Sequence, residues 1–275
     1  MAGLVARSHK IQSLPSGLTP SLAAAKNDTP EVIYPNTKYG CASLNQCVFG
    51  ATSSKKVIVL FGDSHAAMWL PSLMPIAKHD NYKVILLFSF GCPAADLTIW
   101  DPGTGNDLTA CNTARSGDIN MINGLKPNVI LLASRSAQAK SSAKRFFSNA
   151  QWQAGLTKTI GLLKPSGAKV AVIGDITLFN AVPPMCLASY STSVQKCAVA
   201  TPNPIVHNQG HQAAEKAAAA ATKTLYVNPT PWLCTKTCSP VIGSMLAYAD
   251  QWHISDTYAT YLSAVFGDAI KKLLT

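Results

Sequence analysis

Five short segments, each with an uninterrupted apolar run at its centre, recur along this sequence, and they constrain its fold more than any other feature. They are VIVLF (57–61), VILLF (84–88), KPNVILLAS (126–134), GAKVAVIGD (167–175) and TLYVNP (224–229). Continuous apolar strands that alternate with helices are typical of a parallel sheet covered on both faces. We therefore predict an α/β fold: a three-layer α/β/α sandwich around a five-stranded parallel sheet, doubly wound in the flavodoxin-like manner.

The segments between these strands carry the helix signals. We expect helices at 19–26, at 65–80 with a kink or break at Pro71 and Pro75, and at 148–164, 211–223 and 257–274. The connections 91–125, 176–210 and 230–252 are expected as loops. Residues 1–56, which are rich in Pro and Ser, are expected to form an N-terminal extension that packs on one domain of residues 57–275.

Composition excludes several classes of protein. Apolar residues make up 48% of the chain and charged residues 13%, which is typical of a globular protein and not of a disordered one. No apolar run approaches the ~20 residues that span a bilayer, and MAGLVARSHK lacks the apolar core of a signal peptide. The net charge of +10 favours acidic partners, but the basic residues are scattered, so we read them as solvated surface charge and expect no nucleic-acid partner.

The eight cysteines fall into pairs that are close in sequence. The pairs are Cys41/Cys47, Cys92/Cys111, Cys186/Cys197 and Cys234/Cys238. An even number in loop-like surroundings indicates disulfides and an oxidising compartment, although eight cysteines allow roughly a hundred pairings. The alternative is a zinc site at Cys234 and Cys238, for which no second ligand pair is evident. An exported domain without a signal peptide would be a piece of a larger membrane-anchored or secreted protein.

Two short motifs carry the candidate chemistry. Gly62-Asp63-Ser64-His65 follows the first strand, where a serine would sit at a strand-to-helix turn with its N–H opening the helix. Serine needs a base, and Asp250-Gln251-Trp252-His253 offers a histidine with a carboxylate three residues away. Each motif alone also fits a structural role, the first as an ordinary turn and the second as a helix cap.

Taken together, the two motifs resemble the SGNH (GDSL-like) hydrolase superfamily. The resemblance is closest to the SGNH domains fused to the C-terminus of membrane acyltransferase-3 proteins, which O-acylate bacterial envelope glycans. It extends over nearly the whole chain through the segments SGLTPSLAAAKNDTPEVIY, CASLNQCVFG, VIVLFGDSHAAMWLPSL, FSFGCPA, VAVIGDITLFNAVPPMCLAS and YVNPTPWLCTKTCSPVIGSMLAYADQWHIS.

The resemblance implies roles for particular residues. Ser64 matches the nucleophile, His253 the base, Asp250 its orienting carboxylate, and Gly91 the second glycine whose N–H would join that of Ser64 in an oxyanion hole. At the third block the family's Gly-x-Asn is replaced here by Ala133-Ser134-Arg135-Ser136. Either Ser134 or Arg135 substitutes for the missing amide, or the hole has only two donors.

Two further residues are candidates for substrate contact. Trp252 lies between the two triad members and could stack on a sugar, and His65 could line the pocket. The alternative for both is ordinary packing.

The function that the resemblance implies is acyl transfer through an acyl-serine. The acyl group would come from a membrane acyltransferase-3 transmembrane domain in the same full-length chain, and the acceptor would be an envelope glycan or glycolipid. We expect no metal or organic cofactor, and an extracytoplasmic location with a membrane tether. The alternatives are an O-acyl esterase of envelope polysaccharide and a non-catalytic glycan-docking module.

Overall fold

A six-stranded sheet forms the centre of the molecule, and five of its strands are parallel. The computed structural model describes residues 2–30, 47–137, 139–200 and 211–275. The strand order is β1-β3-β2-β6-β9-β11. The strands are β1 (Val48–Gly50), β2 (Val57–Gly62), β3 (Lys83–Phe88), β6 (Val129–Ala133), β9 (Lys169–Ile173) and β11 (Leu225–Val227). All five predicted strands are confirmed, and β1 adds an antiparallel edge strand beside β3.

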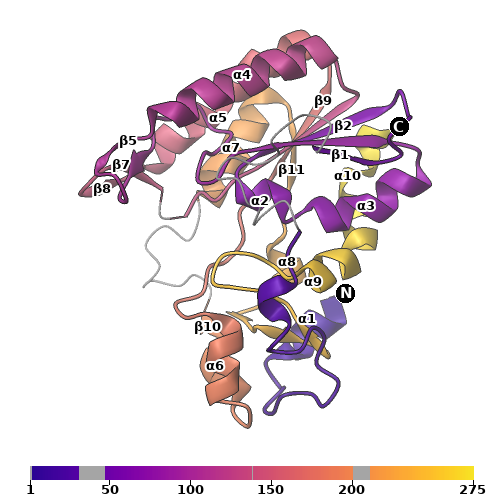
Figure 1. Ribbon diagram of the computed structural model, residues 1–275, viewed down its shortest axis with the longest axis vertical. Coiled ribbons are helices and arrows are strands. Elements are labelled where there is room, and N and C mark those ends of the chain that lie inside the picture. Colours follow the sequence, from indigo (N-terminus) through magenta and orange to yellow (C-terminus); the bar gives the residue numbers. More distant parts are fainter. Residues whose placement is uncertain (1, 31–46, 138, 201–210) are drawn as a thin grey trace.

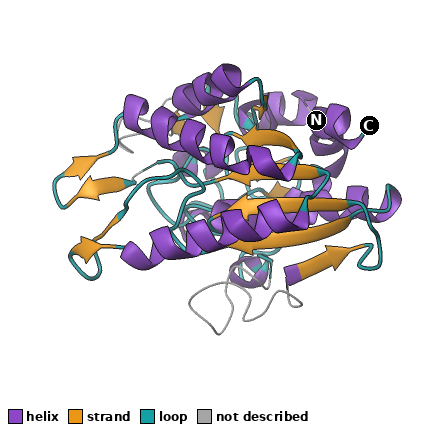
Figure 2. Cartoon of the chain, turned by 90° about the horizontal axis from the view of Figure 1, so that it is seen from above, coloured by secondary structure: helices purple, strands orange, loops and turns teal. Residues whose placement is uncertain are grey.

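Helices cover both faces of this sheet, which makes the predicted three layers (Figure 1). One face carries α4 (Thr109–Leu125), α5 (Asn149–Leu163) and α7 (Gln212–Thr222), and these helices run alongside the strands when seen from above (Figure 2). The other carries α2 (Ser64–Ala67), α3 (Leu70–His79), α9 (Asp256–Tyr261) and α10 (Ser263–Leu274). Alternate residues of β2 point to opposite faces of the sheet. Ile58 and Leu60 pack in the core on the side of α3 and α10. Val59 and Phe61 pack in the core on the side of α4, α5 and α7.

One expected helix and one expected loop need correction. Residues 19–26 form no α-helix; they contain turns and the start of a single 3₁₀ turn, η1 (Ala25–Asn27). The segment 91–125 is not all loop, because α4 occupies its second half. The sequence of α4 contains Gly117 and Gly124 and is polar overall, so its propensity is weak, and burial of Ile119 and Ile122 stabilises it instead.

The helices expected over 65–80 and 257–274 are each divided into two. The helix expected over 65–80 is broken between α2 and α3, with Pro71 in the first turn of α3 where no N–H is needed. The last helix divides at Leu262, and the Ser255 hydroxyl accepts from the Tyr258 N–H as its N-cap.

The remaining elements are short and lie mostly in the connections expected as loops. They are α1 (Ala2–Ser8), β4 (Trp100–Asp101), β5 (Asn106–Asp107), β7 (Lys140–Ser142), β8 (Arg145–Phe146), η3 (Lys164–Ser166), α6 (Pro183–Ser189), η4 (Val194–Cys197), β10 (Val199–Ala200), α8 (Thr230–Leu233), β12 (Thr237–Cys238), β13 (Val241–Ile242) and β14 (Met245–Leu246). None of the described helices is long and apolar enough to cross a membrane.

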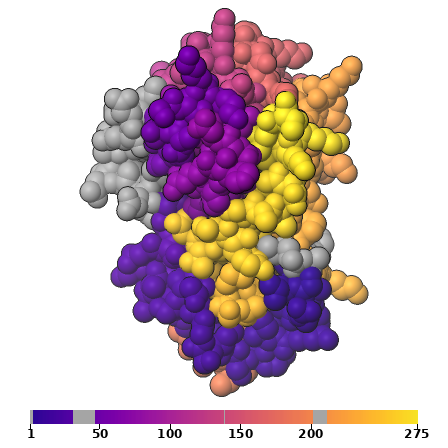
Figure 3. All heavy atoms as spheres, turned by 90° about the vertical axis from the view of Figure 1, so that its right-hand side faces the viewer, coloured from indigo at the N-terminus to yellow at the C-terminus, as the bar shows by residue number. Residues whose placement is uncertain are grey.

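The N-terminal residues lie against the C-terminal part of the chain. Thr19 exchanges backbone hydrogen bonds with Ser244 and Leu246, and the Asp256 N–H donates to the Asp28 carbonyl. Figure 3 shows this indigo segment spread over the end of the molecule beside the yellow C-terminal segment. Residues before 57 therefore do more than lie on the surface, because β1 within them extends the sheet.

Disulfides connect the cysteines that are neighbours in sequence. Cys92–Cys111, Cys186–Cys197 and Cys234–Cys238 are bonded as expected. Cys47 is also disulfide-bonded, while Cys41, its expected partner, lies outside the described residues. The alternative of zinc at Cys234 and Cys238 is wrong, because their sulfurs are bonded to each other.

Candidate active site

The turn that presents Ser64 is determined by Gly62. Gly62 ends β2 with a φ of 155°, and a Cβ there would collide with the carbonyl oxygen of Ala133 on β6. Only glycine fits this close approach of two strands. The chain can then turn sharply at Asp63 and begin α2 at Ser64.

Asp63 fastens this turn to the neighbouring strand. Its buried carboxylate accepts the His65 N–H at 2.8 Å, which caps α2, and the Arg135 N–H at 2.9 Å, just beyond β6. Burial raises the pKa of Asp63, and the contacts with His65 and Arg135 oppose that rise. The Asp63 side chain therefore fixes the backbone on which Ser64 lies, through hydrogen bonds to neighbouring N–H groups. Asp63 is not a member of the triad.

Ser64, His253 and Asp250 are arranged as the sequence predicts for a triad. His253 Nε2 lies 2.9 Å from Ser64 Oγ, and its Nδ1 lies 2.8 Å from Asp250 Oδ2. Asp250 Oδ1 also accepts the N–H groups of Trp252 and His253, at 2.7 and 2.8 Å. The carboxylate is therefore fixed by the same short turn that carries the histidine. With Nδ1–H donated to Asp250, Nε2 is left to accept the proton of the serine hydroxyl.

A second His–Asp pair lies directly behind the triad. His65 Nδ1 is 2.7 Å from Asp175 Oδ1, and both side chains are almost fully buried. The His65 and His253 rings meet edge to face with centroids 5.4 Å apart. Asp175 ends the segment GAKVAVIGD, and no pattern in the sequence predicts its pairing with His65, which is 110 residues away.

The pKa values of two neighbouring buried carboxyl groups, Asp175 and Glu215, move in opposite directions. Burial alone would raise the pKa of Asp175, but His65 and the N–H groups of Ala137 and Ile176 outweigh it and lower that pKa. Glu215, on α7, accepts the Asp175 N–H at 3.0 Å. Burial and the charge of Asp175 raise the pKa of Glu215 well above its ordinary value. The ionised form is therefore favoured at Asp175, and the protonated form is favoured at Glu215.

This difference predicts unequal costs for two isosteric substitutions. At pH 7, Asp175→Asn should lower the free energy of unfolding by about 3–5 kcal/mol, because it leaves His65 without its buried partner. Glu215→Gln should change it by less than about 1 kcal/mol, because the raised pKa of Glu215 favours its neutral form, which the amide resembles. Urea unfolding of both variants measures this, and equal losses would contradict the assignment.

The free energy of unfolding should also depend on pH in a different way for Asp175 and for Glu215. The pKa of Asp175 is lowered, so its stabilisation is present above the ordinary Asp pKa and is lost as the pH falls through the lowered value. The pKa of Glu215 is raised, so its cost grows as the pH rises above the ordinary Glu pKa.

A comparison with known protein families identifies most of the chain. Residues 32–268 match the family described as the SGNH domain fused to AT3 domains. The chain belongs to this family. Among solved structures, this SGNH domain is similar to the periplasmic domain of a lipopolysaccharide acetyltransferase from Salmonella ser. Paratyphi A. The two share 16% identity and a TM-score of 0.66 over 92% of this chain and 98% of that one.

A further solved structure gives a weaker match to the SGNH domain. It is a GDSL-like lipase from Bacteroides thetaiotaomicron, with 16% identity and a TM-score of 0.48 over 79% of this chain and 89% of that one. No curated protein matches the chain.

The candidate oxyanion donors of the SGNH domain differ in their availability. Gly91 is exposed, with a φ of 64°, just beyond β3, which is hydrogen-bonded to β2. Arg135 is excluded as a backbone donor, because Asp63 takes its N–H. The Ser134 hydroxyl accepts the Ala94 N–H at 2.9 Å, which leaves its own proton to donate. Ser134, through its hydroxyl, and Arg135, through its side chain, therefore remain the candidates for the third donor.

The two residues expected to contact substrate have different positions. Trp252 is 39% exposed, and its ring meets that of His253 edge to face at 6.4 Å. His65 is only 1% exposed. The expectation that His65 lines the pocket is therefore wrong; Asp175 draws its ring inward.

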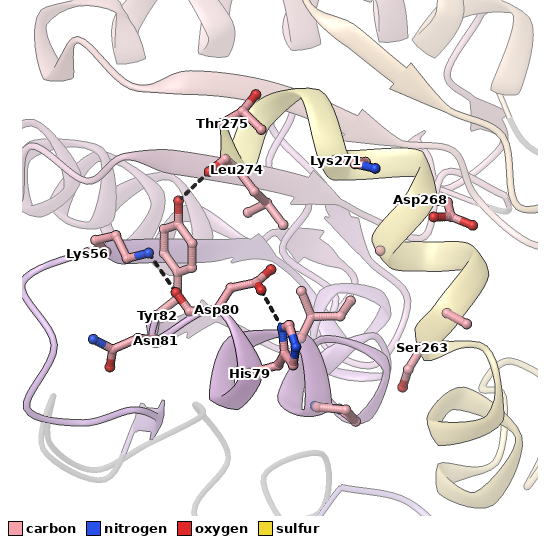
Figure 4. Close-up of a pocket in the computed structure, with 14 residues that line it drawn as sticks. Lys56, His79, Asp80, Asn81, Tyr82, Ser263, Asp268, Lys271, Leu274 and Thr275 are labelled. Atoms are coloured by element: carbon pink, nitrogen blue, oxygen red, sulfur yellow. Dashed lines mark hydrogen bonds and ion pairs between the residues drawn. The ribbon is translucent and has the colours of Figure 1, made fainter.

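A separate groove lies at the amino ends of the parallel strands. It is lined by the second half of α3, by α10 along its length and by residues just before β2 and β3 (Figure 4). The Tyr82 hydroxyl there donates to the Leu274 carbonyl at 3.0 Å. The triad follows the carboxyl end of β2, where ligands bind in open parallel sheets. Among the described residues, no group of three or more His, Cys, Asp or Glu is placed to hold a metal ion.

Proposed function

We propose that this chain is an extracytoplasmic O-acyltransferase domain that moves an acyl group, such as acetyl or succinyl, onto a cell-envelope glycan. The observation that carries the proposal is the hydrogen-bonded chain from Ser64 through His253 to Asp250. A serine activated in this way attacks ester carbonyls and forms an acyl-serine.

The reaction proceeds in two halves. Ser64 Oγ bonds to the carbonyl carbon of the donor while its proton passes to His253 Nε2, and the N–H groups of Ser64 and Gly91 stabilise the oxyanion. The protonated His253 then gives its proton to the leaving oxygen of the donor. In the second half His253 takes the proton of the acceptor hydroxyl, whose oxygen attacks the acyl carbon. The bond from that carbon to Ser64 Oγ then breaks, and His253 returns the proton to Ser64 Oγ.

The family description supports the partner and the location. Because these domains are fused to AT3 domains, we propose that a membrane acyltransferase-3 domain in the full-length protein supplies the acyl group and tethers the SGNH domain. The similar lipopolysaccharide acetyltransferase domain is periplasmic, and the disulfides fit an oxidising compartment. We further propose that residues 57–275 form the catalytic unit and that the preceding residues pack on it.

Hydrolysis is the second candidate function, and a product ratio distinguishes the two. The acceptor raises the effective concentration of one hydroxyl beside the acyl-serine, so transfer should outcompete water when it binds. The experiment offers an acyl donor with and without envelope oligosaccharide and quantifies acylated sugar against free acid. If the oligosaccharide leaves the ratio unchanged while Ser64-dependent hydrolysis continues, the domain is an esterase. If a serine-reactive phosphonate adds no mass at Ser64, the domain is a non-catalytic docking module.

A further inference from the structure

In the described part of the chain, no carboxylate is hydrogen-bonded or ion-paired to the guanidinium of Arg135, although its charge acts on the buried Asp63. Its backbone N–H is bound by Asp63, but its side chain makes no hydrogen bond or ion pair with any described residue. Arg115 shows the contrast: it donates to Asp96, Asn112 and backbone carbonyls and is buried. An arginine with satisfied donors holds structure together, whereas the donors of Arg135 remain available to a ligand.

The position of this guanidinium is fixed beside the triad. Its central carbon lies 5.6 Å from the centre of the Trp252 ring, within the range of a cation–π contact. Trp252 precedes His253, and the backbone of Arg135 is fastened to the carboxylate that caps the helix of Ser64. Both ends of Arg135 are thus tied to elements that carry the triad. A cation–π contact uses none of the N–H groups of the guanidinium as hydrogen-bond donors to an acceptor atom, so they stay available to a ligand.

We infer that Arg135, held by Trp252, is a subsite for an anionic group on the substrate, most simply a carboxylate. Guanidinium and carboxylate pair through two parallel hydrogen bonds, which gives geometric selectivity as well as attraction. The inference rests on the proposed function, because it concerns the substrate of the same serine. The carboxylate has two possible sources: the free end of a dicarboxylic acyl group, or an acidic sugar of the acceptor glycan.

Matched substrates separate these sources. For the acyl group, 4-nitrophenyl hydrogen adipate is compared with 4-nitrophenyl methyl adipate, which has the same chain without the charge. For the acceptor, glucuronic acid is compared with glucose as the sugar that receives acetyl from 4-nitrophenyl acetate. The readout is the ratio of kcat/KM, or of acylated sugar, between the charged and the neutral member of each pair.

The variants are chosen so that only the charge beside the triad changes. Arg135→Gln should reduce the charged-to-neutral ratio of one pair about tenfold, and Arg135→Lys should restore part of it. Arg145→Gln removes the same charge from an exposed strand and should leave both ratios at the wild-type value. Thermal melting checks that Arg135→Gln folds, which we expect because the bond to Asp63 uses the backbone.

The outcomes distinguish this inference from the function on which it rests. A fall in the adipate ratio assigns the carboxylate to the acyl group, and a fall in the sugar ratio assigns it to the acceptor. Wild-type ratios near one in both pairs, or ratios that Arg135→Gln leaves unchanged, would overturn the subsite while Ser64-dependent turnover persists. Turnover that survives Ser64→Ala would instead overturn the proposed function.

Discussion

Ser64→Ala is expected to lower turnover of a small acyl ester about a thousandfold or more. The variant removes the only atom that can form the acyl-serine and leaves His253 Nε2 with no hydroxyl to deprotonate. Alanine is compatible with the start of α2, because the Ser64 side chain forms no hydrogen bond that supports the fold and Asp63 caps the helix. Release of 4-nitrophenol from 4-nitrophenyl acetate measures the effect.

The matched control for this variant is Ser53→Ala. Ser53 is exposed in the turn before β2, so its removal should leave both turnover and thermal stability unchanged. A Ser64→Ala protein that melts like the wild type but retains a rate within a few-fold of it would remove Ser64 from the mechanism.

Asp250→Asn is expected to lower kcat by roughly two to four orders of magnitude while the fold is retained. The amide oxygen can still accept the N–H groups of Trp252 and His253, so the turn survives. The amide has no charge to stabilise the imidazolium that forms in each half of the reaction. It can also present its NH₂ group to Nδ1 and select the tautomer whose Nε2 carries the proton. Steady-state kinetics on the same ester measures this.

A carboxylate outside the site serves as the control for Asp250→Asn. Asp268 is exposed on α10, and Asp268→Asn changes the net charge by the same amount. We expect it to leave kcat unchanged. If both variants lose activity equally, the loss reflects net charge, and the orienting role of Asp250 is wrong.

The sequence predicts features that are encoded locally. The five parallel strands are continuous apolar runs, and both halves of the triad are short motifs whose members lie within four residues of one another. The turn at Gly62 and the cap at Asp63 are likewise local. Two disulfides are also local, because Cys186–Cys197 and Cys234–Cys238 join residues that are 11 and 4 positions apart.

The features that the sequence does not predict depend on contacts between residues that are far apart in the chain. His65 and Asp175 are 110 residues apart and are brought together only by the arrangement of the strands. Helix α4 is formed by residues of weak helix propensity that its packing stabilises. Strand β1 has three residues, too few for a periodic pattern, and its pairing with β3 supplies the missing constraint. The contact of Arg135 with Trp252 is likewise long-range.

The members of the triad lie far apart in the sequence, and this separation determines when Ser64 becomes reactive during synthesis. Ser64 and His253 are 189 residues apart, and β2, which carries the serine, is among the earliest strands of the sheet to be synthesised. Contacts between distant residues form slowly because a long loop must close first. Until residues 250–253 have been synthesised and have folded, Ser64 is an ordinary alcohol. A nascent chain therefore carries no reactive nucleophile, and the appearance of turnover would report that the last part of the domain is in place.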